Sequence, residues 1–492
     1  MSRAKINIIL GPPGTGKTTQ LIDIVEKELE KGTKPSEICY LAFTRRAALE
    51  AIHRSCDKFK LDRSELPYFR TIHSLCYQEL GLTRDQVIQK KHLIELGSEL
   101  GIDIRCKGNF EEGGIWGTTT GDRIVHLENL SRISQKSLKE TWENDDTEDV
   151  HFEELDKFSR AYNVFKESTS LLDFSDMLQL FDHRQCGPFK LFIVDEAQDL
   201  STLQWTIVNN ISKNSEVTYV AGDDDQSIYG WAGANTSRFI NLQGSVKILD
   251  QSYRLPRRIR DLAFTIQESI SNSREKKFKP TTTEGEVCWA SDIEEIDLST
   301  GTWLLLARNT YQLGEFEAMC TRRSIPHETN KTRRYRENTV TAIRSWTDLT
   351  NGKHITGKLV KNLKQYIGIH GDFKDSMKYN LKYLQQYGGV ESNDVWYEAL
   401  TEMVLEEKEF WISALRLGEK ITEKPRIRIS TIHGAKGAEA DHVALVTDIS
   451  RKAYDRLEND PNDEHRVFYV GVTRAKQSLT IISPRTRYYY EI

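Results

Sequence analysis

The sequence has no hydrophobic run long enough to cross a membrane. Its longest apolar stretches, such as residues 303–307, are far shorter than the roughly 20 residues that a spanning helix needs. The apolar residues 6–10 are also too few for the core of a secretory signal, and glycine and proline follow them at once. We therefore expect a protein that has no membrane segment and stays in the cytoplasm.

Paired cysteines and a positive net charge are missing as well. The 7 cysteines include no Cys-x-x-Cys pair, which argues against a zinc or disulfide framework and predicts reduced thiols. The formal net charge of −5 excludes a polycation. Charge is uneven, however, because residues 139–156 are acidic and residues 332–382 are rich in lysine and arginine. Such a basic block can hold a phosphate backbone, although a solvated helix face is the commoner explanation.

The length and composition are those of a multidomain globular protein. A chain of 492 residues corresponds to roughly three or four domains. Hydrophobic residues make up 38% and charged residues 29%, which is typical of a soluble globular chain.

What the sequence does contain is a phosphate-binding signature close to its start. Residues 11–18 fit the pattern G-x-x-x-x-G-K-[ST], between a predicted strand at 6–10 and a predicted helix at 18–29. Glycines let backbone N–H groups close around phosphate oxygens, and the helix N-terminus adds its positive end. Lys17 can reach the β- and γ-phosphates and Thr18 can bind Mg²⁺. The predicted nucleotide-binding residues of this segment are Gly11, Pro12, Pro13, Gly14, Thr15, Gly16, Lys17, Thr18 and Thr19.

Two further apolar runs end in polar residues that complete a hydrolytic site. Residues 191–194 are followed by Asp195, a candidate Mg²⁺ ligand through water, and by Glu196, a candidate base for the attacking water. Residues 217–221 lead to Gln226, which could hydrogen-bond the γ-phosphate or the water. Strands with such groups at their carboxyl ends, and helices between them, predict a mostly parallel α/β sheet.

The order of the motifs resembles that of superfamily 1 DNA helicases, within them the UvrD/Rep/PcrA group. Together with the phosphate loop, the matching segments are residues 41–48, 71–74, 172–176, 194–199, 222–231, 251–254, 430–437 and 469–475. The resemblance implies an α/β fold with two RecA-like parallel-sheet motor domains and two mainly helical inserted accessory domains. The implied boundaries are 1–80 with 166–248 for the first motor domain, 81–165 for the first accessory domain, 249–335 with 425–492 for the second motor domain, and 336–424 for a short second accessory domain.

The resemblance also implies further residues of the nucleotide site, in a cleft between the motor domains. Tyr253 would stack on the base and Glu439 would touch the ribose. Arg254 and Arg474 would reach the γ-phosphate from the second motor domain, which would tie hydrolysis to domain closure. The predicted catalytic set is Lys17, Glu196, Gln226, Arg254 and Arg474, with Mg²⁺ and ATP as cofactors.

A single-strand channel is implied in the same way. Aromatic side chains would stack on bases without sequence preference, and Trp231, in a turn flanked by glycine, would be one of them, unless it is a packed core tryptophan. The predicted DNA-binding residues are Phe43, Thr44, Arg45, Thr71, His73, Tyr229, Trp231 and His433. Single-stranded DNA and single/double-strand junctions are the expected partners, and a monomer or weak self-association the expected state.

Several positions depart from the family pattern. No glutamine precedes the phosphate loop, Thr19 stands where an arginine that contacts adenine is common, and Ala232 replaces an arginine. The first two departures predict a relaxed choice of nucleotide, and Ala232 puts one coupling or DNA contact in doubt.

The leading hypothesis is an ATP-dependent 3′–5′ single-stranded DNA translocase and helicase. The alternatives are an Upf1-like helicase of opposite polarity, a protein-displacing DNA-dependent ATPase with weak unwinding, and a non-catalytic scaffold that only binds DNA. The sequence leaves the pathway open between repair and replication, and the expected location is the cytoplasm, or the host cytoplasm if the protein is viral.

Overall fold

The chain divides into two compact units. The computed structural model describes residues 5–106, 119–145, 149–182, 187–329, 337–421 and 424–492, with the side chain of residue 182 left aside. The first unit comprises residues 1–255 and 267–281, and the second comprises residues 256–266 and 282–492. The basic cluster at residues 332–336 lies outside the described residues. In the part of the chain that is described, no helix is long and apolar enough to cross a membrane.

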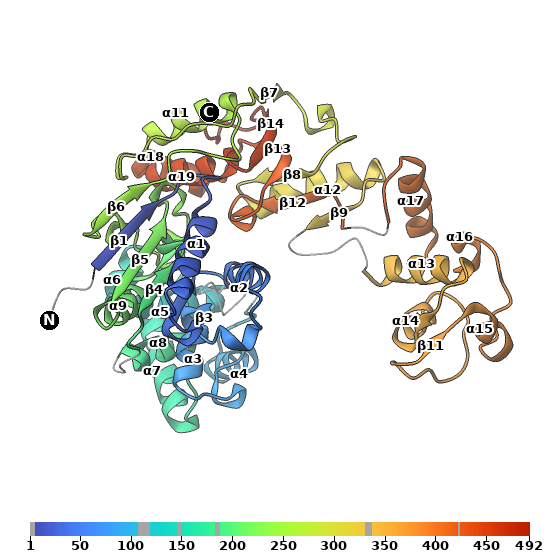
Figure 1. The fold of residues 1–492 in the computed structure, drawn as a ribbon, viewed down its shortest axis with the longest axis horizontal. Coiled ribbons are helices and arrows are strands. Elements are labelled where there is room, and N and C mark those ends of the chain that lie inside the picture. Colours follow the sequence, from blue (N-terminus) through green and yellow to red (C-terminus); the bar gives the residue numbers. More distant parts are fainter. Residues whose placement is uncertain (1–4, 107–118, 146–148, 183–186, 330–336, 422–423) are drawn as a thin grey trace. The chain divides into compact units, whose positions relative to one another are not determined.

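The first unit is built on a six-stranded sheet in which all neighbouring strands are parallel (Figure 1). The strand order is β3-β2-β4-β5-β1-β6. The strands are β1 (Lys5–Leu10), β2 (Ile38–Ala42), β3 (Phe69–Thr71), β4 (Leu191–Val194), β5 (Val217–Gly222) and β6 (Ser245–Ile248). The helices that belong to this sheet are α1 (Lys17–Glu30), α2 (Arg45–Phe59), α3 (Ile72–Glu79), α8 (Phe174–Asp182), α9 (Thr202–Lys213) and α10 (Thr236–Ile240).

The central strands β2 and β4 are buried along their whole length because both faces of the sheet are covered. Alternate residues belong to two separate cores: Ile9 and Tyr40 pack in one, and Ile8 and Leu41 pack in the other. The first core includes residues of α1 and α2, and the second includes residues of α3, α8 and α9. Parallel sheets buried on both faces have this run of hydrophobic residues, so the predicted parallel α/β sheet is confirmed.

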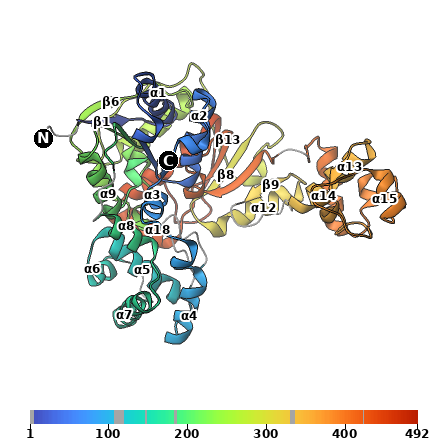
Figure 2. The same ribbon diagram turned by 60° about the horizontal axis from the view of Figure 1, so that its bottom comes forward.

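A helical block is inserted in this unit between α3 and α8. It consists of α4 (Lys90–Leu100), α5 (Thr120–Ser134), α6 (Leu138–Glu143) and α7 (Phe152–Thr169), which gather as one group in Figure 2. The block has its own core, centred on Leu127, Leu155 and Phe158. It continues into α8 through buried ion pairs, in which Arg132 and Lys166 contact Asp173 and Asp176.

The second unit holds the other six-stranded parallel sheet, in the order β7-β14-β13-β8-β12-β9. Its strands are β7 (Glu286–Ala290), β8 (Trp303–Ala307), β9 (His327–Thr329), β12 (Ile427–Thr431), β13 (Ala440–Val446) and β14 (Ala475–Ile482). Its helices are α11 (Arg257–Glu268), whose last residues belong to the first unit, α12 (Leu313–Arg322), α18 (Arg451–Asn459) and α19 (Asn462–Val472). Two parallel α/β sheets confirm the predicted fold class.

A second helical block lies between β9 and β12. It contains α13 (Glu337–Thr350), α14 (Gly357–Leu363), α15 (Leu381–Tyr387), α16 (Trp396–Ala399) and α17 (Leu405–Arg416), with a two-stranded antiparallel sheet of β10 (Ile355–Thr356) and β11 (Lys378–Tyr379). A separate core around Trp346, Leu363 and Trp411 holds the block together.

The compact units divide the chain differently from the predicted boundaries in one region. Residues 249–255 and 267–281 were expected in the second motor domain, but they belong to the first unit. The physical reason is hydrogen bonding: Leu249 N donates to Leu10 O, and Ser252 Oγ donates to Pro13 O. The other predicted boundaries stay a prediction.

Candidate nucleotide and nucleic-acid site

The phosphate loop joins β1 to α1 in the first unit. Gly14 and Gly16 have φ values of 72° and 78°, a region that residues with a Cβ rarely adopt, and Gly16 is the N-cap of α1. At Gly11 a Cβ atom would lie 2.0 Å from Lys17 Cγ. Lys17 Nζ donates to Gly11 O over 2.8 Å, so the lysine folds back along the loop. The glycines are therefore required by backbone shape and by the path of the lysine.

The acidic pair after β4 lies beside this loop. Asp195 Oδ2 accepts hydrogen bonds from Thr18 Oγ1 at 3.3 Å and from the Tyr40 hydroxyl at 2.9 Å. Glu196 Oε1 lies 3.8 Å from Lys17 Nζ. The structure thus brings together Lys17, Thr18, Asp195 and Glu196 from two separate sequence motifs. Sequence reasoning missed Tyr40, which reads only as a strand residue.

Burial shapes the electrostatics of Asp195. Removal from water and the neighbouring Glu196 raise the pKa of this carboxyl to about 6, against the opposing effect of Lys17 and the Tyr40 hydroxyl. A bound cation would favour the ionised form. The Thr18 hydroxyl and the Asp195 carboxylate are oxygen ligands of the kind that Mg²⁺ accepts, and Mg²⁺ commonly takes one or two protein ligands and completes its shell with waters and phosphates. No cluster of three or more His, Cys, Asp or Glu side chains suited to a metal occurs among the described residues.

A hydrogen-bond chain joins Glu196 to Gln226. Gln198 donates its amide to Glu196, and its carbonyl oxygen accepts from Asp223 N at 3.0 Å. Asp223 Oδ2 in turn accepts from Gln226 Nε2 at 2.7 Å. A Cβ at Gly222 would lie 2.4 Å from Gln198 Oε1, so the close approach needs glycine at the end of β5. Glu196, the candidate base, and Gln226, the candidate contact to the γ-phosphate, therefore belong to one hydrogen-bond network.

Residues 251–254 pack against the phosphate loop within the first unit. Tyr253 N donates to Gly14 O over 2.8 Å, while the Tyr253 side chain is 78% exposed and open to stacking. A Cβ at Gly14 would lie 2.4 Å from Arg254 Cβ. Arg254 is thus a neighbour of the loop in its own unit, although the resemblance placed this arginine in the second motor domain. Its action on the γ-phosphate stays a prediction.

An arginine side chain, Arg54, lies next to Thr19, and sequence reasoning missed this contact. Thr19 is exposed, and its hydroxyl accepts a hydrogen bond from Arg54 Nη1 at 3.3 Å. Arg54 lies on α2, four residues after Glu50, with which it also forms an ion pair. The helical spacing gave no sign that this arginine would reach the start of α1.

Aromatic side chains gather at the carboxyl ends of β2 and β5. The ring centroids of Phe43 and Tyr229 are 5.4 Å apart, and those of Tyr229 and Trp231 are 6.1 Å apart. His126 of α5 stacks near Trp231 at 6.3 Å. Trp231 is half-buried, so it has both packing contacts and an accessible part. Three of the predicted DNA-binding residues therefore form one cluster.

Other predicted DNA contacts have structural roles of their own. Thr44 caps α2 by accepting from Ala47 N, and Thr71 caps α3 by accepting from Ser74 N. Arg45, next to Thr44, is exposed. The two threonines therefore have a structural role as helix caps.

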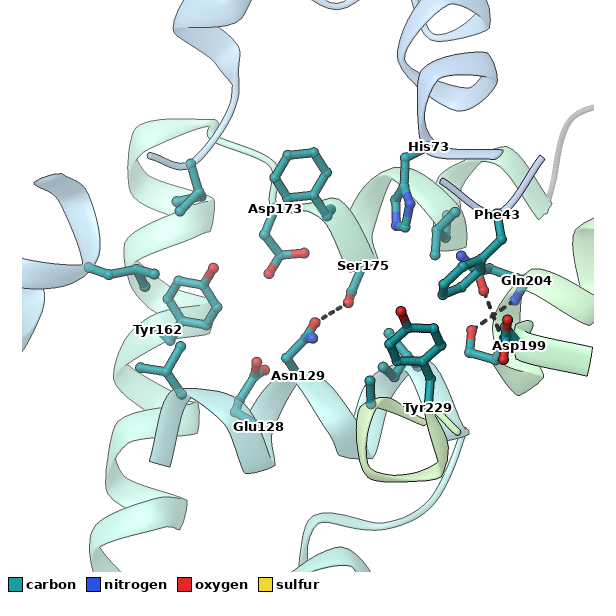
Figure 3. Close-up of a pocket in the computed structure, with 18 residues that line it drawn as sticks. Phe43, His73, Glu128, Asn129, Tyr162, Asp173, Ser175, Asp199, Gln204 and Tyr229 are labelled. Carbon is teal, nitrogen blue, oxygen red and sulfur yellow. Dashed lines mark hydrogen bonds between the residues drawn. The ribbon is translucent and has the colours of Figure 1, made fainter. Parts of the chain in front are cut away.

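A cavity of about 60 Å³ lies beside the aromatic cluster (Figure 3). Phe43, His73 and Tyr229 line it from the sheet side, and Asn129 of α5 reaches it from the helical block, where it accepts from Ser175 Oγ at 2.6 Å. Burial lowers the pKa of His73 to about 4, so its ring is neutral near pH 7. The cavity walls thus combine aliphatic and aromatic side chains with amide and hydroxyl groups and with the carboxyl groups of Glu128, Asp173 and Asp199.

The remaining predicted site residues lie in the second unit. Arg474 is 2% exposed and donates to Val470 O, Ala438 O and Thr473 Oγ1. Glu439 follows Ala438 and pairs with Lys476 at 2.6 Å. His433 begins a short 3-10 turn after β12. Within this unit the structure therefore brings Glu439 and Arg474 onto neighbouring segments.

The structure defines a class of protein before any comparison is made. A glycine-rich loop between a parallel strand and a helix, facing a carboxylate pair on another strand of the same sheet, is the arrangement of phosphate-loop nucleotide-binding proteins. The comparisons narrow this class. Residues 2–247 match the UvrD/REP helicase N-terminal domain, and residues 127–486 match the UvrD-like helicase C-terminal domain. The chain belongs to the UvrD/REP helicase family.

Individual relatives are distant. The chain is 25% identical over 293 residues to the ATP-dependent DNA helicase PcrA of Staphylococcus aureus, which covers 55% of this chain and 39% of the relative. It is also 25% identical over 307 residues to that of Leuconostoc citreum, covering 56% and 38%. The chain thus spans about two fifths of these relatives. A solved complex of Arterivirus nonstructural protein 10 (helicase) with DNA has 10% identity and a TM-score of 0.37, over 98% of this chain and 61% of the other.

Proposed function

We propose that this chain is an ATP-dependent translocase that moves 3′ to 5′ on single-stranded DNA and unwinds duplex DNA. One observation carries the proposal: Gln226, Tyr229 and Trp231 lie on one short segment after β5, which holds the 3-10 helices at residues 224–226 and 230–232. The Gln226 end of this segment is joined to Glu196 through Gln198 and Asp223. The other end belongs to the aromatic cluster. A change at the γ-phosphate can therefore alter the stacking of a base on Tyr229 and Trp231, because few residues separate these rings from Gln226.

Hydrolysis would use the groups around the phosphate loop. Glu196 is placed to accept the proton of the attacking water, and Lys17 to neutralise charge on the β- and γ-phosphates. Thr18 and Asp195 would hold Mg²⁺, which supplies charge neutralisation on the phosphate oxygens when it is bound. Arg254 and Arg474 are proposed to stabilise the transferring phosphoryl group.

The DNA path would use the aromatic cluster of the first unit. Phe43, Tyr229 and Trp231 present rings on which bases of any identity can stack. The neutral His73 adds a hydrogen-bonding edge without a charge. His433 of the second unit is proposed as a further contact, with single/double-strand junctions as the working substrate and a monomer as the working state.

Tailed duplexes test the proposal. Matched duplexes that carry a 3′ or a 5′ single-stranded tail are incubated with ATP and Mg²⁺, with Lys17→Ala as the inactive control. We expect unwinding of the 3′-tailed substrate and ATP turnover that rises with single-stranded DNA. Unwinding from the 5′ tail alone would establish the opposite polarity, and DNA-stimulated turnover that displaces a bound protein without unwinding would establish a protein-displacing ATPase. DNA binding without any turnover would leave only a scaffold.

The opposite polarity has one sequence observation in its favour. The phosphate loop reads Pro12-Pro13-Gly14-Thr15, which is favoured among Upf1-like helicases. The aromatic turn that ends in Trp231 and the match to the UvrD-type family models favour the 3′–5′ direction.

We also propose that the enzyme accepts nucleoside triphosphates other than ATP. Tyr253 can stack on any base, and Thr19 offers only a hydroxyl that Arg54 already contacts. GTP or CTP is expected to support part of the unwinding. Strict dependence on ATP at saturating nucleotide would show that another group reads the adenine edge.

A further inference from the structure

Lys276 is a fully buried lysine that lies outside every predicted site. Its side chain is 0% exposed, and its ammonium lies 2.6 Å from Asp224 Oδ1, 3.0 Å from Asp225 Oδ2 and 3.3 Å from Asp223 Oδ1. The three aspartate side chains are also 0% exposed. One cation is thus enclosed with the three consecutive carboxyl groups of the turn after β5.

The surrounding chain is arranged around this contact. Gln267 donates its side-chain amide to Asp225, and the backbone N of Arg274 donates to Asp224 Oδ2 over 2.6 Å. Burying charged groups away from water costs several kcal/mol per ion unless they are paired and hydrogen-bonded. The aspartate turn can therefore be buried only because residues 267–276 supply a cation and two hydrogen-bond donors.

We propose that Lys276 is a positioning residue for hydrolysis, and that it acts through Asp223 on Gln226. This inference rests on the proposed function. Asp223 uses one carboxylate oxygen toward Lys276 and the other toward Gln226 Nε2, while its backbone N donates to Gln198. Asp223 is therefore the point at which the lysine meets the chain of hydrogen bonds from Glu196 to Gln226.

The chemistry of a carboxylate fixes which end of the Gln226 amide it meets. An ionised carboxylate only accepts hydrogen bonds, so the amide nitrogen must face Asp223. The amide carbonyl oxygen is then the end that can accept a hydrogen bond from the attacking water, whose proton goes to Glu196. The ammonium of Lys276, 3.3 Å from Asp223 Oδ1, holds the Asp223 side chain in place and so holds Gln226 in this orientation. Loss of the ammonium would free the amide to turn.

The place of Lys276 in the chain adds to this role. Residues 267–281 belong to the first unit, whereas the segments on both sides of them, 256–266 and 282 onward, belong to the second. The lysine thus lies on a segment of the first unit whose two neighbours along the sequence belong to the second unit. It links that segment to the turn that carries Gln226.

The test removes the ammonium without changing the net buried charge. The double substitution Lys276→Met with Asp224→Asn takes away one positive and one negative charge and keeps the side chains close in size. Lys277→Met is the matched control, because Lys277 is the next residue and its side chain is 77% exposed. We expect the double variant to fold and to bind a fluorescent ATP analogue like wild type. Its DNA-stimulated kcat should fall by roughly 10–100-fold, as for a displaced catalytic group, and the control should keep the wild-type kcat.

Combination with Gln226→Ala separates positioning from a general structural role. If Lys276 acts through Gln226, adding the double substitution to Gln226→Ala causes no further loss of kcat. Asp223→Asn, which leaves the lysine in place, should show the same lack of additivity. Losses that multiply, a kcat that stays at the wild-type value, or variants that all fail to fold would overturn the proposal. If instead wild type and the Lys277→Met control show no turnover at all, the proposed function itself fails, which is a distinct result.

Discussion

Two acidic turns follow neighbouring strands of the first sheet, and they are used differently. After β4, Asp195 and Glu196 face the phosphate loop, where Thr18 and Lys17 are their partners. After β5, the three aspartates are enclosed with Lys276. Each turn holds one carboxyl group with a raised pKa. Burial raises the pKa to about 6 for Asp195 in the first turn and for Asp225 in the second. The first turn is open to a ligand, and the second is closed by the protein.

The difference shows that an acidic turn acquires its chemistry from the partner that packs on it. At the first turn the partners are the phosphate loop, the Thr18 hydroxyl and Lys17, which are groups that bind a metal and a phosphate. A buried lysine from 52 residues away fills the same kind of position and fixes the turn as a support. Experiments can separate the two turns by turnover, by stability and by metal affinity.

The largest difference is expected in turnover. Glu196→Gln removes the candidate base and should lower kcat by roughly 10²–10⁴-fold, while ATP affinity is retained because Lys17 and Thr18 are unchanged. Asp225→Asn in the closed turn should change kcat only a few-fold, since Asp225 contacts Lys276 and Gln267. Steady-state ATPase assays with saturating single-stranded DNA measure both. Near-normal turnover in Glu196→Gln would assign the base elsewhere.

The next effect concerns stability and its dependence on pH. The folded pKa of Asp225 is above the 3.8 of an unperturbed aspartate, so the folded state binds the proton more tightly. The proton on Asp225 therefore adds to the free energy of unfolding below pH 4. This contribution, up to about 3 kcal/mol, is lost as the pH rises through about 6. Asp225→Asn should be more stable than wild type at pH 8 and lose this advantage at pH 4.5.

Thermal unfolding at the two pH values checks this expectation. The exposed Asp57 on α2 supplies the matched control, because Asp57→Asn removes a carboxyl that is in water. An Asp225→Asn variant with the same pH dependence as wild type would show that the closed turn titrates through another group.

Trp231→Ala tests the aromatic end of the β5 turn. Loss of one stacking ring should weaken single-strand binding by about 1–3 kcal/mol and reduce DNA stimulation of the ATPase, with little change in basal turnover. Trp231→Phe keeps a ring and should recover most of the affinity. Fluorescence anisotropy with a labelled oligonucleotide measures binding. A lower melting temperature with unchanged DNA affinity would assign Trp231 to packing against His126.

The smallest effect is expected at the open turn. Asp195 must be ionised to hold Mg²⁺, so the affinity for Mg²⁺–nucleotide should fall about tenfold per pH unit below 6. The measurement is titration of a nonhydrolysable nucleotide with Mg²⁺ at pH 5, 6 and 7. Asp195→Asn should bind Mg²⁺ weakly at every pH and show no such slope. The same slope in Asp225→Asn is expected, because the closed turn does not meet the metal.

Local patterns predicted the open turn but not the closed one. The phosphate loop and residues 191–196 could be read from the sequence because a short motif follows an apolar strand in each case. Tyr40 and Gln198 were missed because their roles depend on contacts between separate strands. Lys276 and Lys277 look alike as charged neighbours, yet only Lys276 is buried.

One signal could have distinguished these two lysines. Residues 275–279 alternate between exposed and buried, with Lys276 and Phe278 inside. A period of two would have placed Lys276 on the inner face. The assignment of Arg254 to its unit had no such signal, because it depends on hydrogen bonds from Ser252 and Tyr253 to the loop.

The return of residues 267–281 to the first unit also decides how the protein can be taken apart. A gene fragment that stops at the end of β6 would encode the three aspartates of the closed turn without the lysine that neutralises them. Such a fragment should be insoluble when expressed alone, whereas a fragment that continues to residue 281 should give a soluble protein that binds nucleotide. The first unit is therefore encoded by two separate pieces of the gene. Any recombination that exchanges the second sheet must keep residues 267–281 together with the first sheet.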